Sequence, residues 1–213
     1  VRRVFVRSGL RFDYMMLDRD DQFMRELLQY HVSGQLKVAP EHCCNHVLDY
    51  MGKPHIQVFE QFAQRFYRLT KELGKEQYLV PYLISSHPGA TLQDAVQLAV
   101  FLKRHHIHPE QVQDFYPTPG TVSTCMFYTG LDPYTMKEVY VPRSQEEKWL
   151  QRSLLQWWKP ENGRAVLTAL RRAGREDLIG TGPNCLVPPD RRTPQQGAEK
   201  LPAKRAQKGG RQA

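Results

Sequence analysis

Short apolar runs alternate along the chain with longer stretches in which apolar residues recur every three or four positions. The short runs are rich in β-branched and aromatic residues, which is typical of strands, whereas the longer stretches have the period of an amphipathic helix. Because the two kinds of segment alternate, the pattern predicts a parallel α/β fold with helices packed against the sheet. The expected strands cover Val4–Ser8, Gln35–Val38, Tyr78–Ile84 and Gln111–Tyr116.

Helices are expected between these strands and beyond the fourth one. Thr91 with Asp94 three residues later forms a capping pair, and Gly74 is placed to end a helix. We expect the apolar faces to include Phe23 in the first helix and Trp149 in the fifth. The expected helices span Asp18–Tyr30, Val47–Met51, Ile56–Leu73, Thr91–Arg104, Gln145–Trp158 and Gly163–Arg172.

The order of these elements predicts three parts. Residues 1–131 hold four strands, which is half of a TIM-like barrel, and residues 132–186 form a helical extension. Residues 187–213 contain few large apolar residues and are expected to be disordered. A first strand with no preceding element would leave a raw sheet edge, so we expect the chain to be the back part of a longer protein.

Composition and charge exclude some functions. A hydrophobic content of 40% fits a globular domain, and no apolar run approaches the roughly 20 residues of a membrane helix. With no signal peptide either, we expect a cytoplasmic protein without a membrane partner. The net charge is +8, and residues 190–213 carry seven Lys or Arg against two acidic residues, a contribution of 7 − 2 = +5. The remaining +3 does not support a nucleic-acid groove, although the tail could contact RNA weakly.

The four cysteines, which are Cys43, Cys44, Cys125 and Cys185, show neither CxxC nor CxxxCxxC spacing. Adjacent residues such as Cys43 and Cys44 are expected to project in different directions, which suits a shared metal poorly. Buried or incidental thiols are the favoured interpretation, and no metal site is predicted.

The ends of the expected strands are where a parallel α/β fold places its chemistry. In the run LKVAPEHCCNHVLDYMGKP, the spacing of twelve residues can bring Glu41 and Lys53 to the same rim. A carboxylate there can accept from two ribose hydroxyls, and an ammonium can pair with a ligand carboxylate. An ordinary exposed Glu and Lys remain the alternative at this point.

The third and fourth strands end in small or rigid residues. The third ends in YLISSHPGAT, where two serines and a Pro-Gly turn let backbone groups approach a flat ligand closely. The fourth ends in FYPTPGT, an aromatic residue followed by a rigid turn. Each cluster is weak alone, because Pro-Gly turns follow many strands.

Taken in order, the runs KVAPEH, GKEQYLVPYLISSHPG and FYPTPGTVSTCMFYTG resemble the YgiQ-like family of radical S-adenosylmethionine (SAM) proteins. The resemblance covers about residues 1–186 and includes the run AGREDLIGTGPNCLVP near the end. It implies the second half of a radical SAM barrel with a C-terminal extension. It also implies a parent enzyme that uses a [4Fe–4S] cluster to cleave SAM to a 5′-deoxyadenosyl radical, with an unknown substrate.

The resemblance also implies roles for individual residues. Glu41 would hold the ribose of SAM, Lys53 its methionine carboxylate, and the backbone of Ile84–Pro88 would flank the adenine. The implied cofactor-binding residues are Ser8, Glu41, Lys53, Ile84, Ser86, His87, Pro88 and Tyr116.

The chain departs from the family in two side chains and one motif. Ser86 and Ala90 stand where the family has a glycine and an acidic residue, which affects side-chain contacts more than backbone contacts. The CxxxCxxC loop that binds the cluster is absent from this chain and would lie upstream. The chain alone is therefore expected to be inactive, with the missing N-terminal half of the barrel and an electron donor such as flavodoxin or ferredoxin as partners.

Two other functions remain open from the sequence. A metal-dependent hydrolase could recruit Glu41, His42 and His87, but it lacks a His-x-His pair at a strand end, and the histidine run at positions 105–108 precedes the fourth strand. A non-catalytic half-barrel, either an interaction module or a remnant, would expose an apolar edge and should dimerise or aggregate. In that case Trp157 and Trp158 could mark the partner site.

Overall fold

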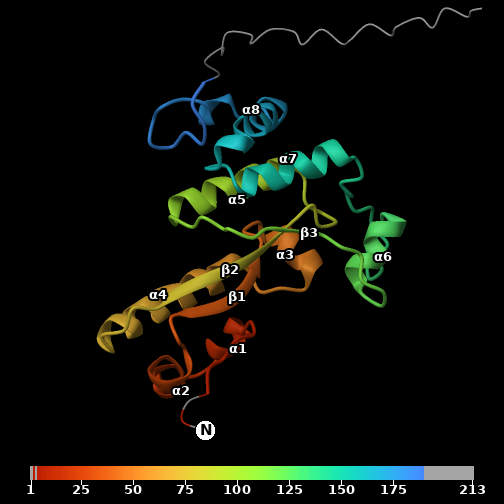
Figure 1. Ribbon diagram of the computed structural model, residues 1–213. Coiled ribbons are helices and arrows are strands. Elements are labelled where there is room, and N and C mark those ends of the chain that lie inside the picture. The colour runs from red at the N-terminus through yellow and green to blue at the C-terminus, as the bar shows by residue number, and fades with distance from the viewer. Residues whose placement is uncertain (1, 3, 190–213) are drawn as a thin grey trace, which may run out of the picture.

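The computed structural model describes residues 2 and 4–189, and within them the fold is α/β, as predicted (Figure 1). The expectation of a disordered tail from residue 187 lies almost wholly outside these residues. The described sheet has three parallel strands in the order β1-β2-β3. They span Gln35–Glu41 (β1), Tyr78–Ser85 (β2) and Gln113–Asp114 (β3).

The second and third predicted strands are confirmed as β1 and β2, but the other two predictions need correction. Val4–Ser8 is not a strand: Val6 donates its N–H to the carbonyl of His31, and the nearest sheet contact is a single parallel bridge between Leu10 and Val38. An alternating apolar run becomes a strand only where a ladder partner exists. The fourth strand shrinks to β3: the N–H of Phe115 still donates to the carbonyl of Ser85 at 2.8 Å, but Pro117 has no N–H with which to extend the ladder further.

Most predicted helices are confirmed within a few residues, including the capping box of Thr91 and Asp94 on α5. The first is wrong in detail: α2 begins only at Gln22 and continues as a π-helical turn over Leu27–His31, and Phe23 is exposed. Two short helices, α1 and α6, were not predicted. The helices are α1 (Phe12–Met15), α2 (Gln22–Glu26), α3 (Asn45–Met51), α4 (Ile56–Glu72), α5 (Leu92–Arg104), α6 (Val122–Thr129), α7 (Gln145–Leu155) and α8 (Gly163–Arg172).

One face of the sheet is covered by α4 and α5. Leu36 and Val38 of β1 belong to the same buried cluster as Phe62 and Phe66 of α4, and Leu83 of β2 packs with Leu98 and Leu102 of α5. Each such side chain contributes roughly 1.5–3 kcal/mol by leaving water. Strand alternation turns other residues to the opposite, open face, where all are partly exposed: Lys37, Ala39, Val80, Tyr82 and Ile84.

The C-terminal helices complete this layer from the side of α5 (Figure 1). Leu150 and Leu154 of α7 and Val166 of α8 form one buried cluster with Ala95 and Ala99 of α5. Trp149, expected on the apolar face, is 52% exposed instead. Among residues 2 and 4–189, no helix has both the length and the apolar run that crossing a bilayer requires.

Candidate functional site

The carboxyl ends of β1 and β2 carry unusual backbone. Glu41 ends β1 with φ +64° and Ser86 follows β2 with φ +60°, so two neighbouring parallel strands both end in the left-handed region. The register between the strands also slips between Val38 and Glu41. A left-handed conformation costs a non-glycine residue roughly 1–2 kcal/mol, and such strain is concentrated at ligand sites.

Glu41 and Lys53 meet at this rim. A Lys53 ammonium hydrogen bonds the Glu41 carboxylate with Nζ 2.7 Å from Oε1, and the side chains are 26% and 18% exposed respectively. The chain returns to the rim because α3 ends at Gly52, which has φ +62°, and the N–H of Lys53 donates to the carbonyl of Leu48 at 2.9 Å. The structure therefore holds an acid and a base together at this rim, with both side chains partly exposed.

The turn after β2 is buried throughout, from Ser85 to Ala90. Gly89 adopts φ +91° and lies against the ring of Tyr50 from α3, where a Cβ would come within 2.3 Å of Cδ2. Its N–H donates to the carbonyl of Tyr140 at 2.6 Å. Glycine is thus required at this position both by backbone conformation and by the close approach of Tyr50.

His87 braces the same turn. Its Nδ1–H donates to the carbonyl of Pro88 at 2.6 Å, and the hydroxyl of Ser123 at the start of α6 donates to Nε2 at 2.8 Å. The ring also packs edge-on against Phe115, with the centroids 5.0 Å apart. Burial lowers the pKa of His87 to about 4, so the imidazole is neutral at pH 7.

Gln151 of α7 also holds this turn. Its Oε1 accepts from the N–H of Ser86, and its Nε2 donates to the carbonyl of Ala90, both at 3.1 Å. The hydroxyl of Ser86 is buried without a partner among the described residues. Sequence reasoning missed Gln151, although its place beside Leu150 on the buried face of α7 was a usable signal.

The loop between β1 and α3 brings together His42, Cys43 and Cys44. The N–H of Cys44 donates to Nδ1 of His42 at 3.0 Å, and burial lowers the pKa of this imidazole to about 4. The two sulfur atoms lie 3.9 Å apart, so the expectation that these side chains point in different directions is wrong. A hydrogen bond with Cys43, followed by burial, raises the pKa of the Cys44 thiol.

Other predicted site residues lie at varied distances from the rim. Ile84 is on the open face of β2 and Pro88 is buried in the turn. Ser8 is exposed and precedes the Leu10–Val38 bridge, which places it toward the amino ends of the parallel strands and away from Glu41. Tyr116 is 76% exposed, and Phe115 rather than Tyr116 contacts His87.

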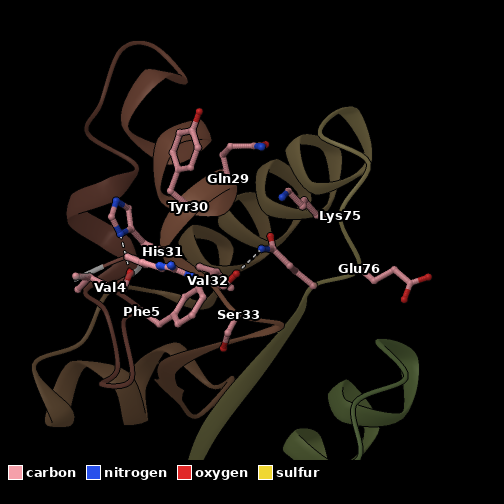
Figure 2. Close-up of a pocket in the computed structure, with 11 residues that line it drawn as sticks. Val4, Phe5, Gln29, Tyr30, His31, Val32, Ser33, Lys75 and Glu76 are labelled. Carbon is pink, nitrogen blue, oxygen red and sulfur yellow. Dashed lines mark hydrogen bonds between the residues drawn. The ribbon is translucent and has the colours of Figure 1, made fainter.

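A separate hollow of about 610 Å³ lies at the opposite end of the sheet (Figure 2). Its lining includes Ser33, which lies two residues before β1, and Gln77, which immediately precedes β2. Figure 2 shows the hydrogen bond between His31 and the carbonyl of Val4 in its lining. Gln77 also donates to the carbonyl of Val32 at 2.9 Å. It contains none of the strand-end residues.

Comparison with known proteins identifies relatives over most of the chain. A family model described as a domain of unknown function (DUF3362) matches residues 110–213. A UPF0313 protein of Clostridium perfringens strain 13 is 60% identical over 187 residues, which is 88% of this chain and 28% of the relative. A UPF0313 protein of Clostridium botulinum strain 657 is 55% identical over 188 residues, 88% of this chain and 29% of the relative. Over 88% of its length the chain is therefore similar to UPF0313 proteins.

This similarity to UPF0313 proteins confirms the resemblance to YgiQ-like proteins at the level of the family. The chain spans less than a third of the length of these UPF0313 relatives, in agreement with a part of a longer protein. No solved structure matches the chain.

Proposed function

We propose that this chain is the C-terminal part of a radical SAM enzyme and forms one side of its SAM pocket. The observation that carries the proposal is the rim itself. Two adjacent parallel strands end in left-handed residues, and a partly exposed Glu41–Lys53 pair lies beside them. Parallel α/β folds bind ligands at this edge of the sheet.

The charged pair suits the polar parts of SAM. Glu41 can accept hydrogen bonds from two ribose hydroxyls, while Lys53 can donate to the methionine carboxylate. In the structure each satisfies the other, so binding exchanges one charge-assisted hydrogen bond for several. Partial exposure of both side chains keeps the cost of that exchange low.

The turn after β2 suits a flat adenine ring. The turn consists mainly of small residues, and Ser86 has a left-handed backbone, so few bulky side chains stand at this end of the strand. The hydroxyl of Ser86 is a buried polar atom without a partner among the described residues. A buried polar atom without a hydrogen bond is costly, so the turn carries strain of the kind that is concentrated at ligand sites. Gln151 and His87 hold the turn in place from behind.

The described residues do not fit a [4Fe–4S] cluster. Such a cluster needs at least three thiolates, whereas the one converging group of metal-ligand side chains in the described part of the chain is His42, Cys43 and Cys44. We therefore assign the cluster to the part of the relatives that this chain does not span. When bound there, it would supply the electron that cleaves SAM, with flavodoxin or ferredoxin as the donor and the cytoplasm as the location.

The open face of the sheet fits the interior of a barrel. Lys37 and Tyr82 lie on it, with the ammonium 5.7 Å from the ring centre, and α4 and α5 cover the other face. In a barrel the helices lie outside and the inner face lines the cavity. In the half-barrel interpretation this face points toward the substrate, and the N-terminal half of the barrel adjoins the outer edge of β1, where Leu10 forms a single bridge with Val38.

The test uses a full-length chimera in which this chain replaces the matching segment of the Clostridium perfringens relative. We expect Glu41→Ala and Lys53→Ala each to weaken SAM binding, measured by calorimetry, by about 1–3 kcal/mol, the scale of a lost charged hydrogen bond. Arg175→Ala is the matched control, because Arg175 pairs with Asp177 in an exposed ion pair outside the rim. It should leave the affinity unchanged.

Equal SAM affinity in all three variants would remove the ligand roles of Glu41 and Lys53. Absence of SAM binding in the unmodified chimera, while the intact relative binds it, would instead favour the non-catalytic alternative for this chain. The non-catalytic alternative rests on the open face of the sheet, where the apolar side chains of Val80 and Ile84 are partly exposed and could bind a partner.

A further inference from the structure

The loop that follows Glu41 holds two thiols side by side. The sulfur atoms of Cys43 and Cys44 are 3.9 Å apart. In a tetrahedral site with metal–sulfur bonds of about 2.3 Å, two thiolates on one ion would be about 3.8 Å apart. The spacing of the two sulfurs therefore already matches the edge of a tetrahedral metal site.

A histidine completes the group. One ring nitrogen of His42 and the two sulfur atoms all lie within 4.8 Å of one another. The N–H of Cys44 donates to Nδ1 of His42 at 3.0 Å, which holds the ring beside the thiols. If Nδ1 bound the metal, this hydrogen bond would be lost, and the N–H of Cys44 would need another acceptor.

The surroundings favour a cation. Asp94, which is 4% exposed, lies beside the group: its backbone carbonyl accepts from the thiol of Cys44 at 3.8 Å, and its carboxylate is 3.2 Å from Nε2 of His46. The thiol of Cys44 also donates to Oε1 of Gln97 at 3.4 Å, a bond that a bound thiolate would not need. No Lys or Arg is paired with Asp94 among the described residues, where its partners are Thr91 and His46. A positive ion would offset this buried charge.

We propose that His42, Cys43 and Cys44 bind one thiophilic divalent cation of the Zn²⁺ class. Two sulfurs and one imidazole leave a fourth position open, as in sites of the Cys₂His type. Binding forms two metal–thiolate bonds and one metal–nitrogen bond, and it releases the two thiol protons to solvent. The metal keeps its charge and nothing is oxidised or reduced.

This site is distinct from the iron–sulfur cluster of the proposed function. It has two thiolates rather than three, and both come from residues within this chain. It also does not depend on SAM binding, so the two proposals can fail separately.

The experiment titrates the chain with Zn²⁺ in competition with a chromophoric chelator, and with Cd²⁺ to detect the ultraviolet absorption of metal–thiolate bonds. We expect one tight equivalent of either ion, with Cd²⁺ absorption corresponding to two thiolates, and no change in mass by light scattering. The matched control is Cys125→Ser/Cys185→Ser, which removes the exposed Cys125 and the distant Cys185 and should bind as tightly as the unmodified chain.

Cys43→Ser and Cys44→Ser should each lower the affinity for Zn²⁺ by at least about tenfold, with far-UV circular dichroism confirming that each variant is folded. His42→Gln should weaken binding while the Cd²⁺ absorption of two thiolates remains. Loss of the tight equivalent in the control, its persistence in Cys43→Ser and Cys44→Ser, or its appearance only with dimer formation would each overturn the proposal. Unchanged affinity in His42→Gln would overturn the role of the imidazole.

Discussion

Two buried histidines, both uncharged, pack beside the carboxyl ends of β1 and β2. His42 accepts the N–H of Cys44 at Nδ1, which only an unprotonated ring nitrogen can do. His87 donates from Nδ1 to the carbonyl of Pro88 and contacts the hydroxyl of Ser123 through Nε2. Burial is the largest cause of the lowered pKa in both, because a charge in either place would lose its hydration. These rings are therefore part of the scaffold at pH 7 rather than proton donors.

The lowered pKa values predict a specific loss of stability with acid. The pKa of each histidine is about 4 when folded and 6.5 when unfolded, so the unfolded state binds more protons between these values. The stabilisation is complete above pH 6.5 and is lost as the pH falls toward 4, at up to about 1.4 kcal/mol per pH unit for each histidine. Urea unfolding at intervals from pH 7 to pH 4.5 measures this slope.

His87→Gln should reduce that slope by about half, because one of the two titrating rings is removed. His105→Gln is the matched control, since His105 is exposed and pairs with Glu60 at the surface. A stability that stays constant over this range in the unmodified chain would contradict the account, because the paired carboxylates titrate at lower pH.

Only part of the rim could be predicted at the level of residues. The meeting of Glu41 and Lys53 follows from a strand end, a short helix and a glycine, all of which are local signals. The contacts of Gln151 and Ser123 join residues that are 65 and 36 positions from their partners, and no local pattern encodes them. The closeness of the two cysteine sulfurs depends on the loop conformation, which their adjacency alone did not predict.

At the scale of elements, α7 holds the strand-end turn of β2 in place. Gln151 is the contact, because its amide serves both the N–H of Ser86 and the carbonyl of Ala90. Gln151 is 1% exposed, so neither backbone group has water as a substitute. The helix therefore determines where the turn lies although it is far away in sequence.

Gln151→Leu should destabilise the chain by about 2–4 kcal/mol, because it leaves two buried backbone groups without partners at roughly 1–3 kcal/mol each. The next residue provides the control: Arg152 forms an exposed ion pair with Asp114, and Arg152→Leu should cost no more than about 1 kcal/mol. The measurement is the midpoint of urea unfolding, provided that the dependence of the unfolding free energy on urea concentration is the same in all variants. If the two variants lost equal stability, the proposal that Gln151 of α7 holds the turn after β2 in place would be refuted.

The elements themselves could be predicted to different degrees. The helices α4, α5, α7 and α8 have clear apolar periods, and α5 also has its capping box, so their ends were predictable within a few residues. Strands depend on partners, and Val4–Ser8 therefore failed although its own pattern is regular. The π-helical turn after Glu26 has no distinguishing pattern and reads as ordinary helix.

At the scale of the whole molecule, the described chain is built around shared clusters. The residues of α5 contribute to a cluster with β2 and to another with α7 and α8, and the α4 cluster contacts Phe101 and Ile107 at the far end of α5. The expected helical extension thus has no buried cluster independent of α5. The sequence pattern changes near residue 131, but residues on both sides of this position pack in one buried cluster.

Shared clusters predict a single unfolding transition. All three tryptophans, Trp149, Trp157 and Trp158, lie in or just after α7, so their fluorescence reports the C-terminal helices, whereas far-UV circular dichroism reports every helix including α4. The two probes should give the same urea midpoint. Leu36→Ala, which removes a fully buried side chain of β1, should cost about 2–5 kcal/mol and lower both midpoints equally, although Leu36 lies in a different cluster from α7. If the fluorescence midpoint stayed constant while the circular dichroism midpoint fell, the C-terminal helices would be a separate folding unit, because only a cooperative structure transmits the loss of a β1 contact to α7.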